Sequence, residues 1–216
     1  MSSTRRPRVL LADDHRLVAE ALKSLLAPDF ELVGMVEDGR ALVQAAQALR
    51  PDVIVADITM PHLNGIDALL ELRKGGDRTP VVFLTMHRDV TFARRALEAG
   101  ASGFVLKHSA PAELVTAIRA ALDGKTYVTP ALAGEVSRAA QGGAPATADP
   151  VASLTARQRE ILQLLADGCS AKDVARRLEI SPRTVEFHKY QMMETLGLQS
   201  SVELIHFAIK HGLVQL

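Results

Sequence analysis

The sequence predicts a five-stranded, doubly wound parallel α/β sheet followed by a small all-helical domain. Over the first half of the chain, strand-like apolar runs alternate five times with helix-like segments, a pattern typical of a parallel sheet covered by helices. After Leu154 only helical spacing of apolar residues is found. A length of 216 residues suits two domains of this kind.

Short apolar runs define the expected strands, which are Arg8–Ala12, Glu31–Val36, Val53–Ala56, Pro80–Leu84 and Gly103–Leu106. Apolar residues at helical spacing lie between and after these runs, and Pro28, Gly100 and Gly124 act as stop signals. The helices expected from this spacing are Arg16–Leu26, Arg40–Leu49, Ile66–Leu72, Val90–Glu98 and Ala112–Leu122. Each strand is therefore followed by one helix.

A linker rich in Gly, Ala and Pro separates the two predicted domains at residues 141–153. We predict a first domain over 1–127, a linker with a short helix (Pro130–Ala140) over 128–152, and a second domain over 153–216. Four helices are expected in the second domain, at Thr155–Ala166, Ala171–Leu178, Pro182–Leu196 and Ser200–Lys210.

Composition narrows the class of protein. Cys169 is the only cysteine, which excludes an intrachain disulfide and a cysteine metal cluster. No apolar run approaches the ~18 residues needed to cross a bilayer, and the polar N-terminus leads into a strand pattern. We expect a cytoplasmic protein without membrane association. The net charge of zero gives no indication of nucleic-acid binding.

Polar residues follow four of the predicted strands: Asp13 and Asp14, Asp57, Thr85, and Lys107. Ligands collect at the carboxyl ends of strands in an open parallel sheet, so these side chains can converge. A single Asp after a strand is more often a helix cap or turn former, but the combination indicates a site. Three carboxylates favour Mg²⁺, which also bridges to phosphate oxygens, and an aspartate can accept a phosphoryl group covalently.

Four motifs resemble the receiver domain of bacterial two-component response regulators. They are Leu10–His15 (LLADDH), Asp57–Pro61 (DITMP) with Asn64-Gly65, Leu84–His87 (LTMH) and Gly100–Lys107 (GASGFVLK). The resemblance implies a flavodoxin-like sheet with strand order 2-1-3-4-5. It also implies that Asp57 accepts phosphate from the phosphohistidine of a sensor histidine kinase.

The same resemblance implies roles for the surrounding residues. Asp14, Asp57 and the backbone carbonyl of Thr59 would bind Mg²⁺, with Asp13 acting through water. Lys107 would pair with the phosphoryl group.

Thr85 and Phe104 would form a switch pair, in which Thr85 moves toward the phosphate and Phe104 turns inward. The alternative for Phe104 is a plain core aromatic. Receivers often have a cis proline after the lysine of the fifth strand, but this chain has His108, so a different loop geometry is expected. His87 and His108 border the site, and a chemical role is not expected for either.

In the second domain, Ala171–Leu178 and Pro182–Leu196 are expected to form a helix-turn-helix. Ser181 is a good N-cap and Pro182 a good first helical residue. Val185, Met192 and Leu196 form the predicted buried stripe. The other face of the helix suits a DNA major groove and carries Arg183, Glu186, Phe187 and Tyr190. The charge of this domain is nearly balanced, so charge alone leaves DNA binding open.

The segments Leu154–Leu162, Ile180–His188 and Leu196-Gly197 resemble the LuxR-type helix-turn-helix, and the whole chain resembles NarL/FixJ-family regulators. The resemblance implies that Pro182–Leu196 is the recognition helix and that the last helix pairs two subunits on DNA. Departures at Ala171 and Thr195, where the family often has polar or basic residues, would weaken phosphate binding.

Direct readout is expected from Glu186, which can accept from cytosine N4, and from Phe187, which can contact thymine methyl groups. Lys172, Thr184 and Lys189 are expected to hold phosphates of double-stranded DNA.

We therefore expect a phosphorylation-controlled transcription regulator that forms a homodimer, and not an enzyme beyond its own phosphoryl transfer and dephosphorylation. One rival is an aspartyl-phosphate phosphatase, which also places a nucleophilic Asp after an apolar strand. It usually has a second acid where Thr59 stands, and it gives no reason for the second domain. The other rival is a regulator that binds DNA without phosphorylation. It gives no reason for the full set of polar residues at the strand ends, which are Asp13, Asp14, Asp57, Thr85 and Lys107.

Overall fold

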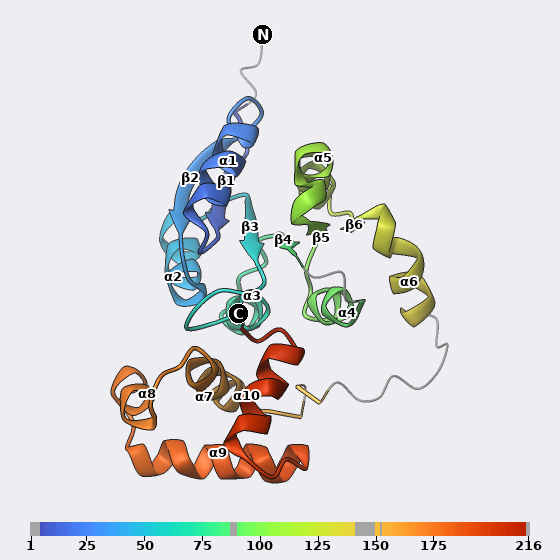
Figure 1. Ribbon diagram of the computed structural model, residues 1–216. Helices are drawn as coiled ribbons and strands as arrows, with labels where there is room; N and C mark the ends of the chain where they lie inside the picture. The colour runs from blue at the N-terminus through green and yellow to red at the C-terminus, as the bar shows by residue number, and fades with distance from the viewer. Residues whose placement is uncertain (1–4, 87–89, 141–149, 152, 215–216) are drawn as a thin grey trace. The chain divides into compact units, whose positions relative to one another are not determined.

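The structure is a computed structural model that describes residues 5–86, 90–140, 150–151 and 153–214. The chain forms two compact units, one built mainly from residues before Pro145 and the other mainly from Pro145 onward. The first is a sheet covered by helices, and the second is helical (Figure 1).

The first unit contains a parallel sheet in the order β2-β1-β3-β4-β5-β6 (Figure 1). Its strands are β1 (Arg8–Ala12), β2 (Glu31–Val36), β3 (Val53–Asp57), β4 (Val81–Thr85), β5 (Gly103–Leu106) and β6 (Tyr127–Val128). The predicted parallel sheet and the order of its first five strands are confirmed. The sixth strand was not predicted, because two residues are too few to show a period. It pairs with β5, with Gly103 opposite Tyr127 and Phe104 opposite Val128.

The helices of this unit are α1 (Arg16–Leu26), α2 (Gly39–Leu49), α3 (Gly65–Lys74), α4 (Val90–Glu98), α5 (Ala110–Leu122) and α6 (Pro130–Ala140). Most of these lie within two residues of the predicted bounds. A 3₁₀ turn, η1 (Lys107–Ser109), joins β5 directly to α5, so α5 begins two residues earlier than expected.

Alternation along the strands places the core on both faces of the sheet. One face packs against α1 and α5 through a shared set of buried apolar residues, among them Val9, Leu11, Val55, Leu84 and Val105. Helices α2, α3 and α4 cover the other face of the sheet (Figure 1). Strands β3, β4 and β5 are buried at every residue, as their continuous apolar runs predict.

The second unit contains α7 (Ala156–Ala166), α8 (Ala171–Arg177), α9 (Pro182–Leu196) and α10 (Ser201–Lys210), which confirms the four predicted helices. Each begins at a Ser or Thr whose side chain accepts a hydrogen bond from the first turn of the helix. At α7 this becomes a full capping box between Thr155 and Gln158. Gly197, in the left-handed conformation, ends α9.

Among the described residues, no helix has both the length and the apolar character needed to cross a membrane.

Candidate functional site

Three predicted site residues meet at the carboxyl ends of β1, β3 and β5. Lys107 Nζ lies 2.6 Å from Asp57 Oδ2 and 2.9 Å from Asp13 Oδ2. Neither carboxylate side chain is exposed, and the Lys107 side chain is 7% exposed. The sheet topology produces this meeting. Strand β3 lies between β1 and β4, β5 lies beside β4, and the carboxyl ends of these parallel strands are at the same edge of the sheet.

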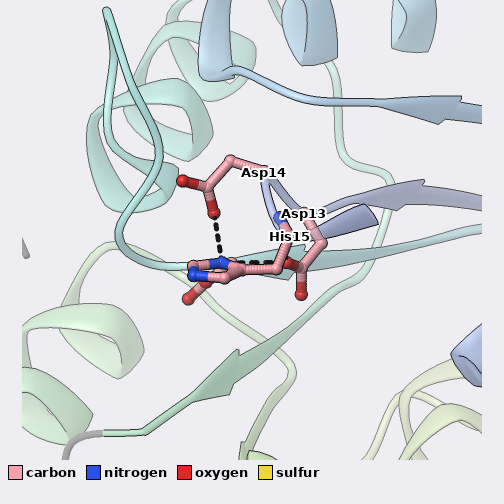
Figure 2. Close-up of side chains that lie close together, drawn as sticks. Asp13, Asp14 and His15 are labelled. Atoms are coloured by element: carbon pink, nitrogen blue, oxygen red, sulfur yellow. Dashed lines mark hydrogen bonds and ion pairs between the residues drawn. The ribbon is translucent and has the colours of Figure 1, made fainter. Parts of the chain in front are cut away.

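Asp14 and His15 follow Asp13 in the chain, and their side chains lie close to it (Figure 2). His15 Nδ1 lies 2.8 Å from Asp14 Oδ1, and the backbone N–H of His15 donates to Asp13 Oδ1 at 2.9 Å. Asp14 is partly exposed, with 31% of its side chain accessible. No role for His15 was predicted from the sequence. Its only signal in the sequence was its position directly after the acid pair.

Asp13, Asp14, His15 and Asp57 each offer one ligand atom, and all four atoms lie within 4.8 Å of one another. Asp13 Oδ2 is buried and lies 2.9 Å from the ammonium nitrogen of Lys107. Three clustered carboxylates suit a hard divalent cation that prefers oxygen ligands. The residues present therefore fit a metal site.

Burial raises the pKa of Asp57 from 3.8 to about 6, even though the Lys107 ammonium beside it acts in the opposite direction. The nearby Asp13 charge adds to the increase. For Lys107, burial acts to lower the pKa, but the two carboxylates outweigh it and the net pKa is raised. The lysine thus stays protonated, and a second cation would favour the ionised form of Asp57.

The loop after β3 holds the Asp57 carboxylate from the other side. The backbone N–H of Thr59 donates to Asp57 Oδ1 at 3.2 Å. Gly65, the first residue of α3, donates its N–H to the carbonyl of Ile58 at 2.7 Å. Asn64 caps α3 by accepting from Asp67 N–H, so this loop is fixed at both ends.

Thr85 and Phe104 lie on the same face of neighbouring strands. In the β4–β5 register, Phe83 pairs with Phe104 and Thr85 pairs with Leu106. Because side chains alternate between the two faces along a strand, Thr85 lies on the same face as Phe83 and is therefore diagonally adjacent to Phe104. Both side chains are fully buried. Phe104 is therefore already directed into the protein in this structure.

The histidines at the border of the site are placed differently. His108 is exposed and belongs to the turn η1, and no cis peptide bond occurs among the described residues. His87 lies outside the described residues. Lys107 and the two residues after it form a 3₁₀ turn.

In the second unit, α8 and α9 form the expected helix-turn-helix (Figure 1). Ser181 Oγ accepts from Thr184 N–H at 3.0 Å, which starts α9. Val185 and Met192 are fully buried, as predicted, whereas Leu196 is only partly buried. The stripe that holds α9 to the core is therefore shorter than predicted.

The opposite face of α9 is open. Phe187 is 58% exposed and Tyr190 69% exposed, which is unusual for aromatic side chains on a helix that has a packed core beside it. Arg183 and Glu186 share this exposure. Lys189 is less available, because its Nζ lies 2.6 Å from Glu186 Oε2 and only 24% of its side chain is accessible.

Two further residues predicted to contact DNA lie beside this face. Lys172 is exposed in the first turn of α8. The hydroxyl of Thr184 is hydrogen-bonded to that of Ser181 at 2.8 Å, within the N-terminal turn of α9.

Comparison with known proteins matches both units. Residues 9–119 match the response regulator receiver domain, and residues 152–208 match the bacterial regulatory proteins of the luxR family. The chain is a response regulator of the NarL/FixJ family. As such it is a two-component, DNA-binding transcription regulator and not an enzyme of the phosphatase class.

Two curated relatives cover nearly the whole chain. Response regulator UvrY of Escherichia coli O6:H1 is 31% identical over 95% of this chain and 94% of its own length. Oxygen regulatory protein NreC of Staphylococcus epidermidis is 34% identical over 96% of this chain and 99% of its own length. A solved complex of the response regulator RcsB with DNA is 25% identical, with a TM-score of 0.56, over 94% of this chain and 98% of that chain.

Proposed function

We propose that this response regulator is switched by transfer of a phosphoryl group to Asp57 from the phosphohistidine of a sensor histidine kinase. The observation that carries the proposal is the buried contact of Lys107 with both Asp57 and Asp13 at one end of the sheet. A nucleophilic carboxylate, a fixed cation and a metal-ligand cluster are the parts that phosphoryl transfer requires.

In this proposal an Asp57 oxygen attacks the phosphorus atom, and the phosphorus–nitrogen bond of the phosphohistidine breaks. The electron pair of that bond stays on the imidazole nitrogen. Lys107 neutralises charge on the phosphoryl oxygens, and the Thr59 N–H, 3.2 Å from Asp57 Oδ1, orients the carboxylate. Attack of water on the acyl phosphate, with loss of inorganic phosphate, restores Asp57.

Asp13, Asp14, Asp57 and the carbonyl of Thr59 would hold Mg²⁺, with Asp13 acting through water. The ion supplies further positive charge for the phosphoryl oxygens. The Asp13 carboxylate offers a ligand atom within 4.8 Å of those of Asp14 and Asp57, which supports its part in this set.

The output step begins at Thr85 and Phe104. Thr85 moves toward the new phosphoryl group, and the packing around Phe104 on the same face adjusts to it. Because Phe104 is already buried, its adjustment is a repacking and not a swing from solvent. This change shifts an equilibrium between a resting state and a dimer-forming state.

The phosphoacceptor domain spans residues 1–127, the linker 128–152 and the DNA-binding domain 153–216. In this cytoplasmic protein, α9 enters the major groove as part of a homodimer bound to promoter DNA, and α10 pairs the subunits. The RcsB–DNA complex supports DNA as the partner. Glu186 and Phe187 read bases, and Arg183, Tyr190, Lys172, Thr184 and Lys189 complete the contact surface.

The test of phosphorylation is intact mass after incubation of the full chain with Mg²⁺ and phosphoramidate. We expect a gain of one phosphoryl group, and a shift toward dimer by light scattering on the same sample. The Asp57→Asn variant, which keeps the shape but removes the nucleophile, is the matched control. Uptake of phosphate by that variant would show that the acceptor is a different residue.

DNA binding is tested by selecting duplexes from a random-sequence library with the phosphorylated chain. Glu186→Gln is expected to relax selection at one base position, with a discrimination change of about 1–3 kcal/mol. Arg183→Ala is expected to weaken binding to all duplexes and to reduce the salt slope by about 1. Equal effects on all sequences for both variants would contradict the readout assigned to Glu186.

A further inference from the structure

The side chain of Thr129 precedes helix α6 but makes hydrogen bonds outside that helix. A Thr before α6 is expected to accept a hydrogen bond from the first turn with its side chain. Instead, the backbone carbonyl of Thr129 accepts from the N–H groups of Leu132 and Ala133, at 2.9 and 3.1 Å. The hydroxyl accepts from Leu106 N–H at 3.2 Å and donates to Glu113 Oε2 at 2.8 Å.

These two bonds lie on either side of Lys107. Leu106 is the last residue of β5 and directly precedes the lysine. Glu113 is in the first turn of α5, which follows η1. The Thr129 hydroxyl therefore ties together the two ends of the segment that presents Lys107 to the acidic cluster.

The backbone of β6 explains how Thr129 reaches this position. Its strand pairs with β5, and the N–H of Thr129 donates to the Phe104 carbonyl at 2.9 Å. If the regular parallel pairing of β5 and β6 continued, the next hydrogen bond would run from Leu106 N–H to the Thr129 carbonyl. Because that carbonyl starts α6, the hydroxyl takes its place.

The bond between Leu106 N–H and the Thr129 hydroxyl is buried, so water does not replace it if the hydroxyl is lost. Thr129 is 1% exposed and Leu106 is not exposed at all. Donation to Glu113 also fixes the hydroxyl proton, which leaves the oxygen lone pairs free for Leu106 N–H. Glu113 serves Tyr127 as well: burial, the Glu113 charge and a hydrogen bond to Glu113 raise the pKa of that phenol.

We propose that Thr129 is a positioning residue for Lys107, acting through Leu106 and Glu113. The inference rests on the proposed phosphorylation of Asp57. Lys107 must hold its ammonium group within 2.6–2.9 Å of two carboxylates, so a small shift of its backbone misplaces the charge. The strand that leads out of the receiver thus takes part in assembling its reactive site.

The experiment compares Thr129→Val, which keeps the shape and loses the hydroxyl, with Thr129→Ser, which keeps the hydroxyl. The rate of phosphorylation of the full chain by phosphoramidate with Mg²⁺ is followed by intact mass. We expect a rate about tenfold lower for Thr129→Val and within about twofold of wild type for Thr129→Ser. A wild-type rate for folded Thr129→Val, or an equal loss for Thr129→Ser, overturns the inference.

A second measurement separates positioning from general weakening of the fold. In a Lys107→Met background, followed over longer incubations, Thr129→Val is expected to cause no further loss, because the group it positions is gone. A further tenfold loss there contradicts the inference. Failure of the wild-type chain to take up phosphate would instead refute the proposed function.

If circular dichroism shows that Thr129→Val does not fold, the Glu113→Ala variant is used in its place. Its side chain is only partly buried, and its loss frees the Thr129 hydroxyl to rotate. We expect phosphorylation several-fold slower than wild type, and an unchanged rate overturns the inference.

Discussion

Replacement of Gly65 by alanine is expected to displace the backbone that carries the phosphoacceptor. A Cβ atom at Gly65 would lie 2.2 Å from the backbone carbonyl oxygen of Asp57 and 2.9 Å from the Phe83 ring. Ordinary contacts of this kind begin near 3.4 Å, so one of the two backbone segments must move by about 1 Å. The opposing group is backbone of the reactive residue itself and has little freedom to move aside.

Two consequences of different size follow from this overlap. Overpacking of a closed site costs about 1–3 kcal/mol, and the helix preference of alanine offsets less than about 1 kcal/mol of it. We therefore expect the free energy of unfolding of the first unit to fall by about 2 kcal/mol. A displacement of about 1 Å at Asp57 is expected to slow phosphorylation by a factor of up to about 100.

The assay combines urea unfolding with the rate of phosphorylation by phosphoramidate. Gly134→Ala is the matched control, since Gly134 also lies in a helix but a Cβ there meets nothing within 4 Å. We expect Gly134→Ala to be as stable as wild type or more stable, and to be phosphorylated normally. If Gly65→Ala matches Gly134→Ala in both measurements, the steric reasoning is wrong.

Three further predictions concern the acidic site and the second unit. Because burial raises the pKa of Asp57 to about 6, protons compete with Mg²⁺ below that pH, and calorimetric Mg²⁺ affinity is expected to fall about tenfold per pH unit there. Asp57→Asn should remove this slope. Met192→Ala, at a fully buried site, is expected to lower the free energy of unfolding of the second unit by about 2–5 kcal/mol in urea titrations. Ser181→Ala removes the N-cap of α9 and should cost about 1 kcal/mol in the same titrations.

The sequence predicted the sheet and its reactive edge because both depend on local signals. An apolar β-branched run such as Val53–Ala56 fixes a buried strand, and a polar residue directly after it marks the strand's end. Topology then brings Asp13, Asp57 and Lys107 together without further information.

What the sequence did not predict depends on contacts between distant residues. The pairing of β6 with β5 is set by backbone hydrogen bonds over only two residues, too few for a period to appear. Thr129 reads locally as a helix cap, and only the fold shows that its hydroxyl serves Leu106. The pairing of Lys189 with Glu186 is likewise a choice among several possible partners on one helix face.

The contact of Tyr127 with Glu113 also gives the protein a built-in optical signal. The chain has two tyrosines and no tryptophan, and the tyrosines are divided between the two units. A carboxylate that accepts from a phenol quenches tyrosine emission, so release of β6 from the sheet should brighten Tyr127. Tyr190, exposed on α9, should respond instead to stacking or contact with DNA. Ultraviolet emission of the unlabelled chain, with Tyr127→Phe and Tyr190→Phe as references, can therefore follow the receiver and the DNA-binding helix separately.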